Sequence, residues 1–190
     1  MIAKPCLAVI LCVLCLAAAP ALAELQIPSV IGSDMVVQRN TDVAVWGWDD
    51  PRTEVTVSFR GNEAKATADD GGRFLTHVPA GKAGGPFEMT IKGTETETLR
   101  NAMVGEVWVA GGQSNMWWPV RRAKDSSKTL AAAAGTPLLR LYQIPGTPSN
   151  KPKDDIDGRW QVCSPESVGN FSAVAYFFSR ELVKSLDVPV

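Results

Sequence analysis

Ser114 is the residue of this chain best suited to chemistry, because it follows two glycines in the segment 105–119, GEVWVAGGQSNMWWP. Residues 106–110 are mostly apolar without clean alternation, which predicts a buried parallel strand. Gly111 and Gly112 then permit a sharp turn. A serine held where a strand gives way to a helix exposes its hydroxyl, and the free N–H groups at the helix start stabilise a developing oxyanion. The segment therefore predicts a nucleophilic serine.

The residues on either side of Ser114 leave an alternative open. The usual nucleophile elbow, GxSxG, is absent, because Gln113 precedes the serine and Asn115 follows it. An ordinary serine N-cap after a glycine-rich turn accounts for the same letters. On the local pattern alone, both interpretations stand.

A serine nucleophile needs a base, and the chain contains a single histidine, His77. His77 lies within residues 73–78, a predicted strand well before Ser114. Nothing in the order of the elements brings the two side chains into hydrogen-bond contact. We expect His77 to be a half-exposed strand residue and not the catalytic base.

The first 23 residues have the layout of a cleavable secretory signal. Lys4 precedes an apolar run over residues 6–19, and small residues close the segment before Glu24. The apolar run is shorter than the ~20 residues that a membrane-spanning helix needs, so a retained anchor is the weaker alternative. We therefore expect an exported protein, periplasmic or extracellular, without stable membrane insertion after cleavage.

The remaining composition excludes several classes of function. Cleavage of the signal would leave Cys163 as the only thiol, which excludes a disulfide framework within the mature chain. Nineteen basic and twenty acidic residues nearly balance, with no basic run, which argues against a nucleic-acid partner. One histidine and one mature cysteine build no typical zinc site, so neither a metal nor another cofactor is expected.

Residues 24–104 alternate short β-rich runs with turn signals. The runs 43–48, 54–60, 63–68, 73–78 and 87–92 are separated by glycine, asparagine, aspartate and proline. This spacing predicts an antiparallel β-sandwich domain.

From residue 105 the pattern is that of an α/β domain that stops early. Residues 138–144 and 158–162 are further strand candidates. Asn170 is the expected N-cap of a helix over residues 171–186, with an apolar face made of Phe171, Val174, Ala175, Phe178 and Leu182. An α/β layer needs several parallel strands covered on both faces, and too few are present. We expect residues 105–190 to be the first part of a larger α/β domain, in a fragment or truncated gene model.

The segment around Ser114 closely resembles the nucleophile segment of the sialate O-acetylesterase family, within the SGNH hydrolases. Residues 35–38 (MVVQ) with 45–47 (VWG), and 165–178 (PESVGNFSAVAYFF), resemble the same family. The resemblance implies a mixed fold, an N-terminal antiparallel β-sandwich followed by an incomplete three-layer α/β (SGNH hydrolase-like) domain. It also implies a secreted carbohydrate esterase that removes O-acetyl groups from a sugar or glycan.

By this resemblance Ser114 is the nucleophile, its own N–H contributes to the oxyanion hole, and Gln113 and Asn115 support the site. The family's Asp-x-x-His pair, which supplies the base and its carboxylate, has no counterpart in this sequence. We therefore expect the 190 residues alone to have little esterase turnover.

One position departs from the family, which often has an acidic residue where this chain has Trp117. Trp117 and Trp118 are candidates for stacking on a sugar ring, or for core aromatics beneath the turn. Two other functions remain open. One is an acetyl xylan-type polysaccharide esterase, and the other is a non-catalytic carbohydrate-binding β-sandwich protein that uses Trp46 and Trp48.

Overall fold

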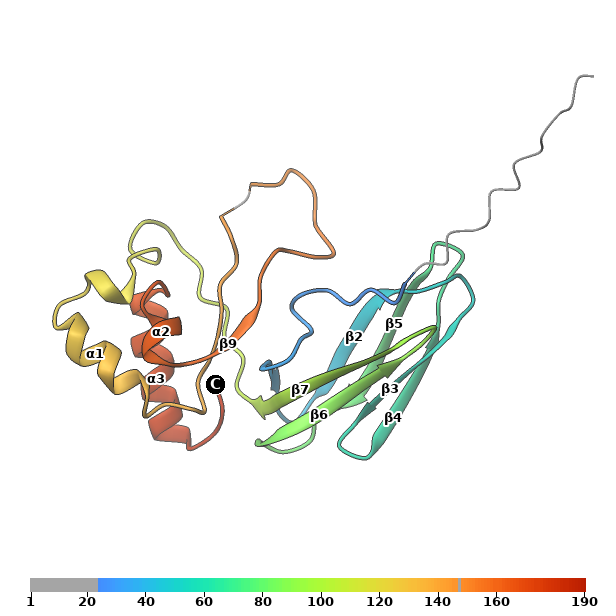
Figure 1. Ribbon diagram of the computed structural model, residues 1–190, viewed down its shortest axis with the longest axis horizontal. Helices are drawn as coiled ribbons and strands as arrows, with labels where there is room; N and C mark the ends of the chain where they lie inside the picture. Colours follow the sequence, from blue (N-terminus) through green and yellow to red (C-terminus); the bar gives the residue numbers. More distant parts are fainter. Residues whose placement is uncertain (1–23, 147) are drawn as a thin grey trace, which may run out of the picture.

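The computed structural model describes residues 24–146 and 148–190 (Figure 1). The expected signal segment, residues 1–23, lies outside the described residues. The strands of the first hundred residues form one body, and the helices gather in a second one at the left of Figure 1. The chain passes between them directly from the end of strand β7.

Seven strands build the β-rich body: β1 (Val36–Gln38), β2 (Asp42–Trp48), β3 (Glu54–Phe59), β4 (Asn62–Thr67), β5 (Arg73–Pro79), β6 (Gly84–Lys92) and β7 (Thr96–Gly105). One sheet has the order β1-β7-β6-β3-β4, and β2 and β5 form a separate pair. β1 runs parallel to β7, whereas the other pairings are antiparallel. The larger sheet is therefore mixed, and not wholly antiparallel as expected.

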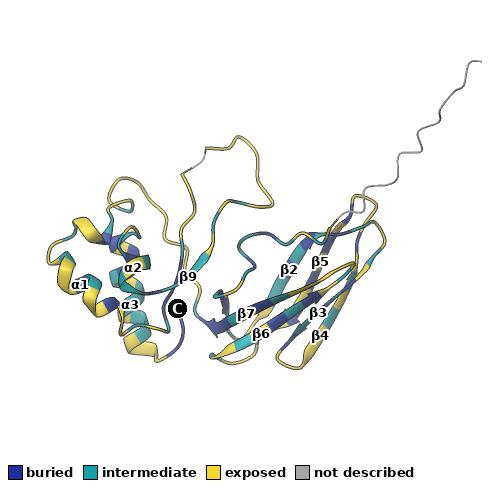
Figure 2. Ribbon diagram, viewed as in Figure 1, coloured by how far each residue is buried: buried dark blue, intermediate teal, exposed yellow. Residues whose placement is uncertain are grey.

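The two sheets share one apolar core, toward which β3 and β5 turn every second side chain. In β3, Val55, Val57 and Phe59 are buried while the residues between them are half-buried. In β5, Phe74 and Val78 are buried opposite them in the same cluster. Burial of an alternating apolar face is the main favourable term for such a sheet. Figure 2 shows this buried stripe along the strands.

A buried carboxylate closes the turn after β2. Asp49 is 1% exposed and accepts hydrogen bonds from the backbone N–H of Asp50 (2.7 Å), the N–H of Thr94 (2.9 Å) and the hydroxyl of Thr94 (2.6 Å). These donors compensate for the loss of water around the charge. Asp49 thereby links the turn after β2 to the turn around Thr94, between β6 and β7.

The second body contains the short helix η1 (Val120–Arg122), helix α1 (Ser126–Ala133), strands β8 (Arg140–Tyr142) and β9 (Trp160–Val162), and helices α2 (Pro165–Val168) and α3 (Ala173–Leu186). β8 and β9 pair antiparallel. A second apolar cluster, which includes Leu139, Leu141, Val168 and Tyr176, holds the helices to this pair. Within residues 24–146 and 148–190, no helix is long and apolar enough to cross a membrane.

The expected helix after Asn170 exists, but two details of its prediction were wrong. Its N-cap is Ser172, whose hydroxyl accepts from the N–H of Ala175 (3.3 Å), so α3 begins two residues later. Ala173, Ala175 and Tyr176 are its buried side chains, whereas Val174 is 49% and Phe178 46% exposed. Phe171 and Leu182 of the predicted face do pack against the second apolar cluster. The buried members of that cluster on α3 are Ala173 and Tyr176, so Val174 and Phe178 of the predicted stripe face solvent.

The strand predicted over residues 106–110 is absent. β7 ends at Gly105, and the next five residues form no ladder. A strand requires a neighbour that pairs with its N–H and C=O groups. Glu106 has one, since its N–H donates to the carbonyl of Pro189 (2.8 Å), but within the described residues no backbone group pairs with residues 107–110. Val107, Trp108 and Val109 are consequently exposed, Val109 to 90%.

Candidate active site

Ser114 lies in a compact turn and not at the start of a helix. The N–H of Met116 donates to the carbonyl of Gln113 (2.9 Å), and the N–H of Trp117 donates to that of Ser114 (3.2 Å). Residues 111–115 are all exposed. The sequence correctly predicted an exposed serine after a glycine turn, but the expected helix start behind it is missing.

The turn is held from its C-terminal side by the start of α3. Pro119 forms an isolated β-bridge with Ser172, and the N–H of Ala173 donates to the carbonyl of Trp118 (2.8 Å). The Ser172 hydroxyl also donates to Met116 Sδ (3.3 Å). Helix α3 therefore fixes the residues directly after the serine turn.

The same segment is held from its N-terminal side by β1. The Gln38 side chain donates to Glu106 Oε2 (3.0 Å) and accepts from the N–H of Val107 (2.9 Å). Arg39 Nε forms an ion pair with Glu106 Oε1 (2.6 Å). The hydrogen bond from Gln38, followed by that from Arg39, lowers the pKa of Glu106 below its ordinary value. We call Gln38, Arg39 and Glu106 the β1 clamp.

The β1 clamp links residues 35–38 to residues 105–106 in space. Parallel pairing sets Gln38 opposite Gly105, so the amide reaches the first residues beyond the strand. Sequence reasoning had noted the first of these segments without giving Gln38 a role. The pairing joins residues 68 positions apart, which periodicity within either segment does not reveal.

The two bodies also touch through the loop that precedes β9. Asp155 Oδ1 accepts from the N–H of Ser29 (2.9 Å), and the Ser29 hydroxyl lies 2.7 Å from that of Tyr142. The indole of Trp160 donates to the carbonyl of Val30 (2.8 Å). This second contact, together with the clamp, fixes the helical body against the sheets.

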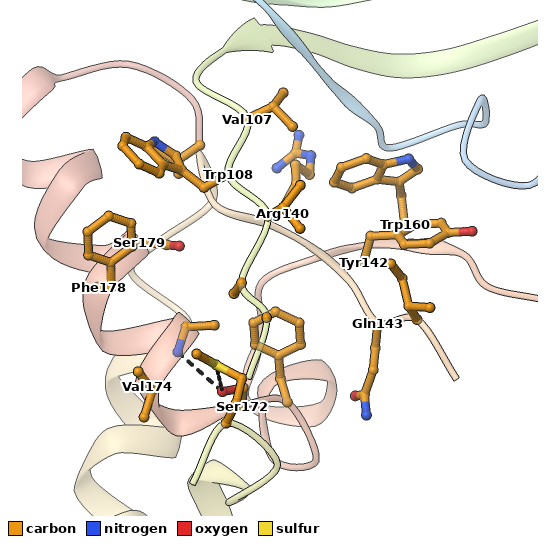
Figure 3. Close-up of a pocket in the computed structure, with 18 of the residues that line it drawn as sticks. Val107, Trp108, Arg140, Tyr142, Gln143, Trp160, Ser172, Val174, Phe178 and Ser179 are labelled. Atoms are coloured by element: carbon orange, nitrogen blue, oxygen red, sulfur yellow. Dashed lines mark hydrogen bonds between the residues drawn. The ribbon is translucent and has the colours of Figure 1, made fainter. Parts of the chain in front are cut away.

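Two depressions lie beside the serine turn. The first is an apolar groove of about 650 Å³ between the exposed segment 107–112 and α3, and Figure 3 shows Trp108, Val174 and Phe178 along it. The second is a more open hollow, which is lined by Gln113, Ser114, Trp117, Trp118, Pro119 and Arg122. Ser114 belongs to the hollow and not to the apolar groove, and Trp117 borders both.

Trp117 and Trp118 are 55% and 50% exposed, so their interpretation as core aromatics was wrong. Gln113 and Asn115 are both exposed beside the serine, and Gln113 also lines the hollow. The expected supporting residues therefore lie beside Ser114.

No base accompanies Ser114. Among the described residues, its hydroxyl has no hydrogen-bond partner, and the single histidine lies elsewhere. His77 is exposed on β5, where it faces Ala44 of β2. Cys163 is buried, and burial raises the pKa of its thiol. Residues 24–146 and 148–190 contain no group of three or more metal-ligating side chains.

Comparison with solved structures identifies the class of protein that has this fold. The chain is similar to a crystal structure of a carbohydrate acetylesterase from Xanthomonas citri, with a TM-score of 0.84 and 37% identity. The match covers 87% of this chain and 39% of that protein. A mixed β-rich body with few helices is thus the fold of part of a carbohydrate esterase.

Curated relatives narrow the class to one family. The sialate O-acetylesterases of Mus musculus, Pongo abelii and Homo sapiens are 32%, 30% and 30% identical to this chain, and each match covers 85% of it. The chain belongs to the sialate O-acetylesterase family, which confirms the resemblance found in the sequence. It spans about a third of the length of these relatives. No family model matches the chain.

Proposed function

We propose that these residues carry the nucleophile of an exported carbohydrate O-acetylesterase. The observation that supports this most is the exposed Ser114 hydroxyl, which is open to a ligand in a hollow while the β1 clamp and α3 fix the backbone on both sides. The relatives named for acetylesterase activity support the reaction class. Export to the periplasm or beyond follows from the leader pattern of residues 1–23.

The proposed reaction is acyl transfer to serine. Ser114 Oγ attacks the acetyl carbonyl while a histidine base takes its proton, and an oxyanion develops beside the N–H of Ser114. The C–O bond to the sugar then breaks, and the sugar oxygen receives the proton. Water attacks the acetyl-enzyme in the same manner, which releases acetate and restores the hydroxyl. Gln113 and Asn115 are proposed to support the site, and no cofactor is needed.

The base is proposed to lie outside the 190 residues. His77 is on another body of the molecule, and the chain spans only about a third of its relatives. We also propose the division into a β-sandwich (residues 24–104) and the first part of an SGNH-like α/β domain (residues 105–190). On this proposal the chain alone has little turnover.

An acidic sugar such as sialate is favoured over a neutral xylan by one observation. Arg122 lines the hollow that contains Ser114, and its guanidinium has no ion pair within the described residues. A cation in that position complements a sugar carboxylate. A binding function centred on Trp46 and Trp48 has less support, because both rings are half-buried and the Trp46 indole donates to the carbonyl of Asp154 (3.2 Å).

The test is acetate release from O-acetylated sialic acid by the longer protein that contains these residues. Ser114→Ala is expected to abolish release, and Ser126→Ala, on α1, is the matched control. Full activity of Ser114→Ala would refute the assignment. The 190-residue chain itself is assayed on p-nitrophenyl acetate, where turnover that depends on His77 would overturn the proposed external base.

A further inference from the structure

Trp117 is a large apolar side chain that is half-exposed beside Ser114, where the groove and the hollow adjoin. It is 55% exposed and borders both the groove and the hollow. Burial of so large an apolar ring would stabilise the fold, and much of that stabilisation is absent here. Adjacent exposed aromatics, Trp117 and Trp118, are typical of a binding surface.

The ring is held in position despite its exposure. The N–H of Trp117 closes the serine turn on the carbonyl of Ser114, and the edge of the indole lies against the backbone at Gly146. A methyl group at residue 146 would lie 3.2 Å from Trp117 Cη2 and Cζ2, which is a tight contact. One edge of the ring is thus fixed by backbone while the rest stays open. A fixed aromatic surface loses little conformational entropy when a ligand covers it.

The surroundings of the ring combine one apolar face with hydrogen-bonding groups. Gln113, Ser114 and Arg122 line the same hollow as Trp117. A pyranose ring presents an apolar C–H face and a rim of hydroxyls, so it suits an aromatic ring bordered by amide, hydroxyl and guanidinium groups. The hollow is lined by six residues, whereas a stable protein interface involves about 20–30 residues on each side. Its size and mixed chemistry favour a single sugar ring.

We propose that Trp117 is the stacking platform for the pyranose ring that carries the ester, and that it sets which sugars are accepted. The pyranose would lie on the Trp117 indole, with one of its substituents directed toward Ser114. This inference rests on the proposed function in taking Ser114 as the reacting residue. The binding itself requires neither the ester nor the missing base.

The experiment titrates the 190-residue chain with two sugars that carry no O-acetyl ester, N-acetylneuraminic acid and methyl β-D-xylopyranoside. Binding is followed by NMR through the indole N–H signals. Trp117→Ala is expected to weaken binding about tenfold, which corresponds to about 1.4 kcal/mol, because the apolar surface that the sugar covers is lost. Trp117→Phe keeps a ring and should recover most of the affinity. Trp108→Ala is the matched control, because Trp108 is equally exposed (56%) but lies on the groove only.

A second variant moves the platform without removing it. Gly146→Ala should shift the indole by a few tenths of an ångström and weaken binding about two- to threefold, with an unchanged melting temperature. The proposal is overturned if neither sugar binds, or if Trp117→Ala and Trp108→Ala weaken binding equally. If sugar binding depends on Trp117 but acetate release survives Ser114→Ala, only the assignment of Ser114 as the nucleophile is refuted. The failure of the proposed function is therefore distinguishable from the failure of the proposed platform.

Discussion

Gly105 should tolerate no side chain, because the end of β7 lies directly against the backbone of Pro189. A Cβ at residue 105 would lie 2.5 Å from the Pro189 carbonyl carbon and 2.8 Å from its Cβ, and closer still to its carbonyl oxygen. The N–H of Glu106 donates to that same oxygen (2.8 Å). Gly105→Ala therefore forces either the strand end or residues 188–190 to move.

The two routes differ in their cost in free energy. Moving the strand end adds overpacking of about 1–3 kcal/mol and loss of one hydrogen bond of about 1 kcal/mol. Releasing the last residues instead exposes Val188 and Val190, which are 8% and 5% exposed, at a cost of about 1.5–3 kcal/mol each. The cheaper route gives a loss of about 2–4 kcal/mol in the free energy of unfolding. For a chain of this size, that lowers the melting temperature by roughly 5–15 °C.

Thermal unfolding followed by circular dichroism measures this effect, and Gly111→Ala is the matched control. A Cβ at Gly111 meets nothing within 4 Å, so that variant should stay within about 0.5 kcal/mol of the wild type. Hydrogen exchange at the N–H of Arg140, which donates to the carbonyl of Val190 (2.8 Å), reports whether the chain end has been released. Melting temperatures of the two variants within 2 °C of each other would refute the packing argument.

Three further changes test other contacts. Glu106→Gln should cost about 1 kcal/mol at pH 7, because a charge-assisted bond is lost. Since the fold lowers the pKa of Glu106, its contribution is present above the ordinary value of 4.5 and is lost as pH falls through the folded pKa, so the difference from wild type in urea unfolding should shrink toward pH 3. Asp49→Ala should cost about 2–4 kcal/mol by leaving the N–H of Thr94 without its acceptor, and a melting temperature like that of the exposed variant Asp70→Ala would contradict this. Ser172→Ala should cost about 1 kcal/mol through loss of the α3 N-cap, detectable as faster hydrogen exchange at Ala175.

Local patterning predicted most of the β-rich body. The predicted runs overlap β2 to β6 closely, because alternation of buried and exposed side chains is a property of each strand by itself. The prediction over residues 106–110 was wrong for the opposite reason. An apolar run becomes a strand only when a partner lies beside it, and that depends on residues far away in the chain. The error in the face of α3 has a similar cause, because the side of a helix that is buried depends on the cluster against which it packs.

Ser114 was predictable from the sequence, but the residues that hold its turn in place were not. Ser114 is evident from its glycines and its resemblance to a known segment. Gln38 and Ser172, which hold the turn from two sides, are distant in sequence and carry no chemistry of their own. Their roles follow only from the parallel pairing of β1 with β7 and from the bridge at Pro119.

The segment from Val107 to Met116 is tied at both ends, by Gln38 and by Ser172, and this makes its length a constraint in its own right. One inserted residue adds up to about 3.3–3.6 Å of extended chain. That displacement exceeds the ~2.6–3.2 Å hydrogen bond through which a base must reach a serine. Substitutions at the exposed positions of this segment therefore leave its length unchanged. An insertion or deletion would misplace Ser114 even with every side chain intact.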